Sequence, residues 1–369
     1  MTAESAVPPA GAIDIPADPA VEDAPDPSSA GPTPPDGSVA PEDNPPAGSR
    51  RRRLILLFLL IATLLLALFT IWYLITRKPI TELPIPVVPA VDVPAYSHSI
   101  YDVVAPTGVA VSADGSRIYA TQTEAERQVI AFDASGNQVA SLKPPDVGGD
   151  HVPVYVALDP LTGEIYVSDR PAASIYVFSP DGTYLRDFDP GPELAGWAPL
   201  GVAFAAGGDL FVTNVGAPYE SVLQFARDGS LVRTYGSEGE LNFPNGVSVD
   251  ANGAVYVSDS NNGRLVIFDQ AGNKLGVVRR GVSIGDLGLP RGSAIDDAGR
   301  VFVADISQQG IQAYKVLAIG ERQPRFIGGF GEAGTADGSF QRPNAVAVDA
   351  RGRVYIADWR NNRIQVWSY

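Results

Sequence analysis

A short pattern recurs six times along the chain, and this repetition limits the possible fold more than any other feature. Each copy starts at a proline, continues as a short apolar segment, makes a Gly-rich turn and returns as a second apolar segment. The six prolines are 45 to 53 residues apart, at Pro106, Pro153, Pro199, Pro244, Pro290 and Pro343. A period of this length is typical of arrays in which every unit is one supersecondary structure.

A third apolar segment follows in every copy, and a fourth follows in most copies. The third segments lie at 128–133, 174–179, 221–226, 264–269, 310–315 and 363–368. They are rich in Val, Ile, Tyr and Phe, which favour strands, and pairs such as Asn252-Gly253 suit the tight turns between strands. Four strands in about 45 residues form one blade of a β-propeller. The sequence therefore predicts an all-β fold, a six-bladed β-propeller.

The last copy reaches Tyr369 immediately after its third strand. The residues before the first copy, Tyr96 to Val104, have the character of an additional strand. We therefore predict that this N-terminal strand completes the C-terminal blade, so that the propeller covers residues 96–369. Such closure removes the exposed sheet edges that an open ring would leave.

The repeat, P-x-G-[VI]-A-V-D-x-x-G-x-[VI]-Y-V-[SA]-D followed by N-x-R-[IL]-x-V-F, resembles the NHL repeat family. The fullest copies run from Asp259 to Phe268 and from Asp358 to Trp367, and the loop from Phe330 to Phe340 is similar to the family's linker. The resemblance covers roughly residues 96–369. It implies a six-bladed propeller in a membrane-anchored, bacterial-type member, and fold alone does not determine function.

The N-terminal region differs from the repeats in composition. Residues 1–49 contain twelve prolines and nine acidic residues, without any Lys, Arg or aromatic residue. Such a segment has too little apolar surface to offset the entropy lost on ordering. We predict a disordered tail.

An uncharged apolar run, Leu54 to Thr76, follows this tail. As a helix it is about 34 Å long, enough to cross the roughly 30 Å hydrocarbon core of a bilayer. Four arginines precede it at 50–53, and only Arg77 and Lys78 follow it. Because positive residues prefer the cytoplasmic side, we predict one transmembrane helix within 50–78 and a cytoplasmic N-terminus.

The orientation places the repeats outside the cytoplasm, behind a Pro-rich extended spacer at 79–95. The predicted location is the cell membrane, with a single pass. A cleaved signal peptide is the alternative. Its apolar region would be about 7–15 residues long and would precede an A-x-A-like site, whereas this run is longer and precedes Thr-Arg-Lys-Pro.

The composition disfavours several classes of function. The formal net charge of −15 opposes binding to the phosphate backbone of nucleic acids, so we expect no nucleic-acid partner. The chain has no cysteine and two histidines, which disfavours thiolate and most His-based metal sites. We expect no cofactor and no bound metal.

Two short motif matches lie in settings that do not suit their chemistry. Gly281 to Gly285 fits G-x-S-x-G, which needs a strand–turn–helix and a histidine base. Gly329 to Gly334 fits the dinucleotide fingerprint, which needs a helix after the glycines. Both segments lie between predicted blades. We expect neither a catalytic serine nor a dinucleotide site.

Polar residues at the ends of the second strands, Asp169, Asn214, Asp259, Asp305 and Asp358, have two interpretations. They could form an acidic mouth, or they could accept hydrogen bonds from backbone amides of neighbouring turns. The structural role is favoured.

The residue after each repeat proline is expected near the propeller axis, because the first strands line the central channel. These positions hold Thr107, Val154, Leu200, Asn245, Arg291 and Asn344. Calcium-dependent lactonase-type propellers resemble this repeat, and Pro244-Asn245-Gly246 matches one of their metal-ligand motifs. Arg291 is unsuitable beside a dication, and Val154 and Leu200 offer no oxygen ligand.

The rim that contains these positions is the predicted binding face for a protein, a peptide or a small molecule. It is expected to include Asn245, Arg291 and Asn344 together with Tyr219, Trp359 and Arg360. Aromatic and arginine side chains are common anchors of binding energy. The alternative is that Arg291 pairs with neighbouring acids and Trp359 packs between blades. At the level of function, a membrane-tethered binding scaffold or sensor module is favoured, and a lactonase-like hydrolase or lyase at the axial mouth is the alternative.

Overall fold

A computed structural model describes residues 47–76, 93–145, 150–191, 194, 196–216 and 220–369. The chain divides into two units, Met1–Pro86 and Val87–Tyr369. The predicted disordered tail lies outside the described residues as far as residue 46. The predicted spacer lies outside them from residue 79 to residue 92.

The described part of the first unit is a single helix, α1 (Ala47–Thr76), as the apolar run predicts. Its segment Leu54–Ile71 is long and apolar enough to cross a membrane. Thr63 and Thr70 donate hydroxyl hydrogen bonds at 2.8 Å to the carbonyls of Leu59 and Leu66, so both hydroxyls are satisfied within the helix. Some signal sequences also contain an apolar helix long enough to meet this criterion.

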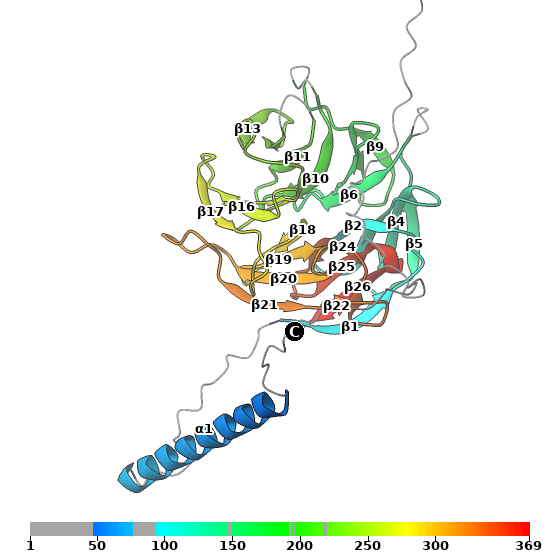
Figure 1. The fold of residues 1–369 in the computed structure, drawn as a ribbon. Coiled ribbons are helices and arrows are strands. Elements are labelled where there is room, and N and C mark those ends of the chain that lie inside the picture. The colour runs from blue at the N-terminus through cyan, green and yellow to red at the C-terminus, as the bar shows by residue number, and fades with distance from the viewer. Residues whose placement is uncertain (1–46, 77–92, 146–149, 192–193, 195, 217–219) are drawn as a thin grey trace, which may run out of the picture. The chain divides into compact units, whose positions relative to one another are not determined.

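The second unit is a ring of six four-stranded antiparallel sheets (Figure 1), which confirms the all-β, six-bladed propeller. Blade 1 comprises β2 (Pro106–Val111), β3 (Arg117–Gln122), β4 (Gln128–Asp133) and β5 (Gln138–Leu142). Blade 2 comprises β6 (Pro153–Leu158), β7 (Ile165–Asp169), β8 (Ser174–Phe178) and β9 (Tyr184–Asp187). Blade 3 comprises β10 (Pro199–Phe204), β11 (Leu210–Asn214), β12 (Ser221–Phe225) and β13 (Leu231–Tyr235).

The remaining blades follow the same plan. Blade 4 comprises β14 (Pro244–Val249), β15 (Val255–Asp259), β16 (Arg264–Phe268) and β17 (Lys274–Val278). Blade 5 comprises β18 (Pro290–Ile295), β19 (Arg300–Asp305), β20 (Gly310–Lys315) and β21 (Phe326–Phe330). Blade 6 comprises β24 (Pro343–Val348), β25 (Val354–Asp358), β26 (Arg363–Ser368) and, from the other end of the unit, β1 (Ala95–Ile100). The short strands β22 (Glu332–Ala333) and β23 (Ser339–Phe340) pair in parallel between blades 5 and 6.

The ring closes as the sequence predicts. β1 pairs antiparallel with β26, with Ile100 opposite Ile364, and so supplies the fourth strand of the last blade. The innermost strands contact one another in order around the ring, and β24 of blade 6 contacts β2 of blade 1. Both edges of the repeat array are therefore covered.

Apolar side chains between the blades form the core. The middle strands of each blade are buried, and their largest enclosed side chains are aromatic residues such as Tyr256, Phe268, Tyr314 and Phe302. Period-two alternation sends neighbouring residues of these strands to opposite faces, and each face meets the next blade. The repeat is therefore a packing unit that is stable only beside its neighbours.

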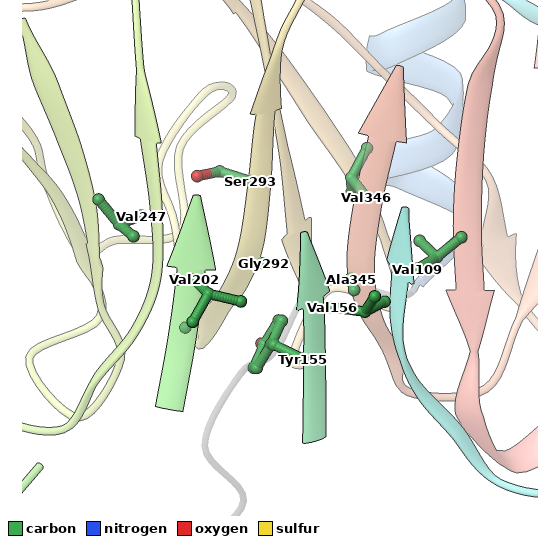
Figure 2. A pocket seen from close by; sticks show the side chains of 11 residues that line it. Val109, Tyr155, Val156, Val202, Val247, Gly292, Ser293, Ala345 and Val346 are labelled. Atoms are coloured by element: carbon green, nitrogen blue, oxygen red, sulfur yellow. The ribbon is translucent and has the colours of Figure 1, made fainter. Parts of the chain in front are cut away.

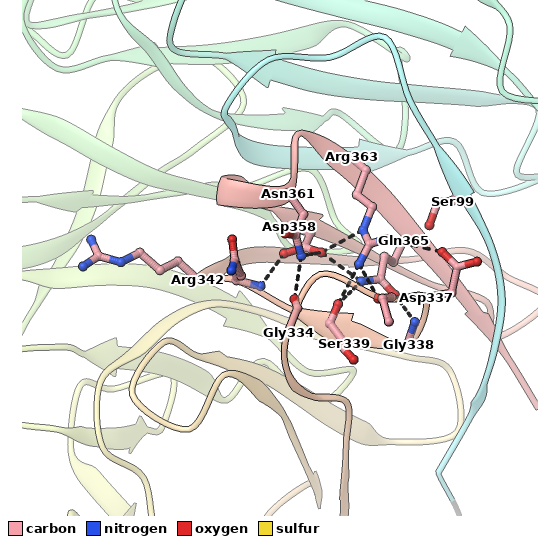
Figure 3. Close-up of polar contacts among 12 residues, drawn as sticks. Ser99, Gly334, Asp337, Gly338, Ser339, Arg342, Asp358, Asn361, Arg363 and Gln365 are labelled. Carbon is pink, nitrogen blue, oxygen red and sulfur yellow. Dashed lines mark hydrogen bonds and ion pairs between the residues drawn. The ribbon is translucent and has the colours of Figure 1, made fainter.

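The buried carboxylates at the ends of the second strands have the structural role that the turn chemistry favours. Asp358 accepts a hydrogen bond from the backbone N–H of Gln341 at 2.8 Å, and Asp259 accepts one from Asn242 at 2.7 Å. Each carboxylate thus anchors the loop that precedes the repeat proline at the start of its own blade. In blade 6 the same carboxylate also anchors Arg363, as Figure 3 shows.

Candidate ligand-binding site at the axial mouth

The innermost strands share one irregularity that determines which side chains reach the axis. In each blade the pairing between first and second strand shifts register directly after the repeat proline, for example between Pro244 and Gly246 and between Pro343 and Ala345. An irregularity of this kind re-aims side chains and ends regular pairing. It occurs here at the end of the channel that we call the axial mouth, formed by Thr107, Tyr155, Asn245, Arg291 and Asn344.

Small residues at the third repeat position allow adjacent blades to meet closely. A Cβ atom on Gly246 would lie 2.5 Å from the Arg291 carbonyl oxygen, and one on Gly292 would lie 2.8 Å from the Ala345 Cα. Contacts this short are not tolerated, so glycine is required for the close approach of the backbones. Blade 2 carries Tyr155 at this position instead.

The Tyr155 side chain crosses the axis. Its hydroxyl donates to Asn245 Oδ1 of blade 4 and lies 3.4 Å from Asn344 Nδ2 of blade 6, which donates to it. Blades 2, 4 and 6 are not neighbours in the ring, so only a side chain at the axis can join them. Asn344 Nδ2 also donates to the Thr107 carbonyl of blade 1 at 2.6 Å. These contacts form a polar plug across the channel.

A narrow cavity of about 40 Å³ lies along the axis and is lined by all six innermost strands. Figure 2 shows Tyr155 on its wall with valines from several blades. A cavity of this size accommodates a few water molecules, at about 10–15 Å³ each. The channel therefore has no room for a metabolite, and a larger ligand has to bind at the mouth or on the rim.

Burial raises the pKa of the Tyr155 hydroxyl far above its usual range, although the nearby positive charge of Arg291 and the hydrogen bond with Asn344 lower it. The phenol therefore stays protonated at physiological pH and acts as a hydrogen-bond donor. A neutral phenol and two amides can orient a ligand, but they do not abstract a proton at neutral pH.

Arg291 brings a positive charge to this neutral plug. Its Nε is enclosed and has no hydrogen-bond partner. Burial lowers the pKa of the Arg291 guanidinium; the nearby Tyr155 raises it, and the positive charge of Arg342 lowers it further. Among the described residues, no Asp or Glu forms an ion pair with Arg291. The alternative that Arg291 pairs with neighbouring acids therefore finds no support among the described residues.

Aromatic and cationic side chains gather in the loops of the same rim. The guanidinium carbons of Arg342 and Arg360 lie 5.7 Å and 4.3 Å from the centre of the Trp359 ring, and that of Arg170 lies 5.4 Å from the Phe243 ring. Trp359 is buried, whereas Arg360 is half exposed and lies 3.6 Å from a Glu124 carboxylate oxygen. The burial of Trp359 is consistent with packing between blades. The guanidinium groups over its ring are consistent with a binding surface.

Several non-glycine residues of this rim have a left-handed backbone, and Ala105, Phe243 and Arg342 among them lie directly before a repeat proline. Phe243 and Arg342, each directly before a repeat proline, have φ angles of 52° and 58°. Such angles are unfavourable for side chains other than glycine, and they concentrate at binding sites. The surroundings hold them in place, because Arg342 N–H donates to Gln309 Oε1 at 2.6 Å and Phe243 N–H donates to Glu220 Oε2.

The structure brings three of the predicted site residues, Asn245, Arg291 and Asn344, together at the axial mouth. Trp359 and Arg360 lie in the short 3₁₀ helix η2 (Trp359–Asn361), and Tyr219 lies outside the described residues. The prediction missed Tyr155. One signal could have found it, because Tyr155 stands where five copies of the repeat have glycine or alanine.

The resemblance to metal-dependent propellers finds little support at Asn245, because its side-chain oxygen already accepts the Tyr155 hydrogen bond. Within the described part of the chain, no group of three or more His, Asp or Glu residues is arranged to hold a metal ion. The two glycine-rich motif matches lie in loops and short strands between blades: Ser283 follows β17, and Gly334 precedes β23. Neither precedes a helix.

Comparison with known proteins agrees with the repeat. The NHL repeat model matches residues 241–268 and 340–367, which lie in blades 4 and 6. Blades 4 and 6 thus carry NHL repeats within the six-bladed propeller. NHL repeat-containing protein 3 of Homo sapiens is 29% identical over 239 residues, which cover 60% of this chain and 56% of that protein. The Mus musculus protein is 28% identical over 219 residues, which cover 58% of this chain and 51% of its own length.

The chain thus spans about half the length of these animal relatives, and a bacterial-type origin stays a prediction. Among solved structures, virginiamycin B lyase from Staphylococcus aureus is similar with a TM-score of 0.51 and 17% identity, covering 71% of this chain and 80% of that chain. A streptogramin B lyase is similar with a TM-score of 0.51 and 13% identity, covering 73% and 96%. At such identities the likeness concerns the fold alone.

Proposed function

We propose that this chain is a membrane-tethered, extracytoplasmic binding module whose NHL-repeat propeller holds a protein, peptide or small-molecule ligand at the axial mouth. The observation that carries the proposal is the half-buried Arg291, which has no carboxylate partner among the described residues, beside the Tyr155–Asn245–Asn344 plug. A largely desolvated cation without a counter-charge is costly, and a bound ligand could supply one.

The rim around the mouth suits such a role. Interfaces concentrate their energy in Arg, Trp and Tyr side chains, and Arg342 and Arg360 both lie over the Trp359 ring there. The opposite rim consists of short turns between first and second strands, such as 113–116 and 251–253, which offer few anchors. We therefore assign binding to the Arg291 rim.

The binding experiment is a crosslinking pull-down of the full chain from its own membranes. We expect Arg291→Ala and Trp359→Ala to reduce capture of the partner, and Asn252→Ala, in a turn of the opposite rim, to leave it unchanged. If the partner is still captured by Arg291→Ala and Trp359→Ala but not by Asn252→Ala, the binding face lies on the opposite rim. Turnover of a substrate by the purified chain would favour the hydrolase or lyase alternative.

Membrane tethering is supported by α1 and by the four arginines that precede its apolar segment. Protease added to intact spheroplasts should degrade the propeller and spare residues 1–49, whereas lysis should expose both. A protected propeller contradicts the proposed orientation. The mass of the mature chain tests the anchor itself, because cleavage as a signal peptide would remove the tail and the helix.

A further inference from the structure

Enclosed arginines in this propeller generally meet a carboxylate. The ion pairs are Arg264–Asp259 at 2.6 Å, Arg300–Asp296 at 2.6 Å, Arg353–Asp349 at 2.7 Å and Arg363–Asp358 at 3.0 Å. Arg291 lacks such a partner in the described part of the chain, and its Nε has no hydrogen bond. The four other arginines are thus neutralised by a carboxylate, whereas no carboxylate of the described residues neutralises Arg291.

We propose that the axial mouth binds a carboxylate group of the ligand, with Arg291 as its anchor. This rests on the proposed binding function and specifies the chemistry of its ligand. The two Nη groups of Arg291 are not enclosed as Nε is, and the pair of Nη–H donors of a guanidinium forms a planar fork that matches the two oxygens of a carboxylate. A bound carboxylate would supply the missing counter-charge and would offset the repulsion between Arg291 and Arg342.

The surroundings favour a carboxylate over a phosphate. Phosphate sites commonly use several backbone N–H groups from a helix N-terminus or a glycine-rich loop. Two such groups near the mouth are already engaged, since Gly108 N–H and Gly201 N–H donate at 2.7 Å to the hydroxyls of Thr121 and Thr213. The planar guanidinium of Arg291 beside the neutral amides of Asn245 and Asn344 matches the shape and single charge of a carboxylate.

The rest of the ligand would extend toward the rim, because the channel below Tyr155 has space for only about 40 Å³. The carboxylate could belong to a small organic acid or to the C-terminus of a peptide, and both present the same group to Arg291. Paired probes that differ only in carrying an acid or an amide show whether the carboxylate or the rest of the ligand is recognised.

The test measures the melting temperature of the full chain in detergent micelles at pH 7 and constant ionic strength. Benzoate should raise the melting temperature saturably, since a ligand that binds the folded state stabilises it, and benzamide should not. Arg291→Gln should weaken the apparent benzoate affinity about tenfold or more. Arg186→Gln is the matched control, because Arg186 already pairs with Glu164 at 2.8 Å on an outer strand.

The tripeptide Gly-Gly-Phe and its C-terminal amide provide the second pair of probes. Stabilisation by the peptide acid at lower concentrations than benzoate would indicate a peptide C-terminus, and the reverse order would indicate a small acid; either supports the site. Equal effects of benzoate and benzamide would overturn the proposal. So would a benzoate effect that persists in Arg291→Gln, or stronger stabilisation by inorganic phosphate.

The comparison of acid and amide probes needs no variant, so it decides the question even if Arg291→Gln does not fold. Partner capture distinguishes this inference from the proposed function. Loss of capture in Arg291→Gln without any benzoate effect would leave the binding function standing and refute the carboxylate. A benzoate effect that depends on Arg291, with capture unchanged, would support the carboxylate site and refute the protein-binding role of this rim.

Discussion

Arg363 in blade 6 and Arg291 at the axial mouth are both held within the fold, but their surroundings differ. Arg363 lies in the network of Figure 3, where its Nε contacts Asp358 at 3.0 Å and its Nη2 donates to the carbonyls of Ala336 and Ser339 at 2.7 and 2.8 Å. Arg291 has the enclosed, unpartnered Nε described above. Arg363 is thus paired within the fold, whereas Arg291 has no carboxylate partner among the described residues.

The pKa values of the two guanidiniums move in opposite directions. Burial lowers the pKa of Arg363, but its hydrogen bonds and charge interactions with Asp358 and Tyr101 outweigh burial, so the net pKa is raised. For Arg291 burial dominates and the pKa is lowered. Burial therefore disfavours the cation at both sites, and the partners of Arg363 reverse the balance there.

The largest expected effect comes from removing the strand that covers the Arg363 network. A chain that starts at Pro106 lacks β1 and leaves the outer edge of β26, including Ile364, uncovered. A chain that starts at Val91 keeps β1 and serves as the control. Because natural domains are stable by only about 5–15 kcal/mol, we expect the shorter chain to melt far lower or not to fold. Equal melting temperatures would show that β1 is dispensable.

The second prediction concerns the ion pair between Arg363 and Asp358. Arg363→Met keeps much of the side-chain length but leaves the fully buried Asp358 carboxylate without its cation. Removing one partner of a buried ion pair typically costs about 3–5 kcal/mol, and we expect a loss of this size in urea unfolding of the Val91 chain. A loss below about 1 kcal/mol would mean that Asn361 and Gln365, which also donate to Asp358, suffice without Arg363.

The third prediction concerns the plug beside Arg291. Tyr155→Phe removes the hydroxyl that donates to Asn245 and leaves a buried amide oxygen unsatisfied. The expected cost is about 1–3 kcal/mol of unfolding free energy, measured by urea denaturation. Tyr184→Phe is a suitable control, because its hydroxyl bonds an exposed Asp187 on an outer strand. Similar small losses in both variants would show that the plug adds little stability.

The contrast between the two arginines could be predicted only in part. The repeat pattern predicts the blades, the closing strand and the role of Asp358, since each depends on local sequence and period. The surroundings of Arg291 depend on side chains from blades 2, 4 and 6 that meet across the axis. Tyr155 is distant from Asn344 in sequence, and no local pattern indicates that its hydroxyl reaches that residue. Its departure from glycine is the only sign in the sequence.

The smallest effect on stability, and the sharpest test of the comparison, is the same substitution at the other arginine. Arg291→Met removes a cation that has no carboxylate to leave behind and replaces it with an apolar side chain of similar reach. Urea unfolding of the Val91 chain should give a free energy within about 0.5 kcal/mol of the unsubstituted chain, or slightly higher, because an unpaired polar group no longer needs to be enclosed. Partner capture by the full chain should nevertheless fall. A loss near that expected for Arg363→Met would instead mean that Arg291 has a structural role like that of Arg363, and the distinction between the two sites would no longer hold.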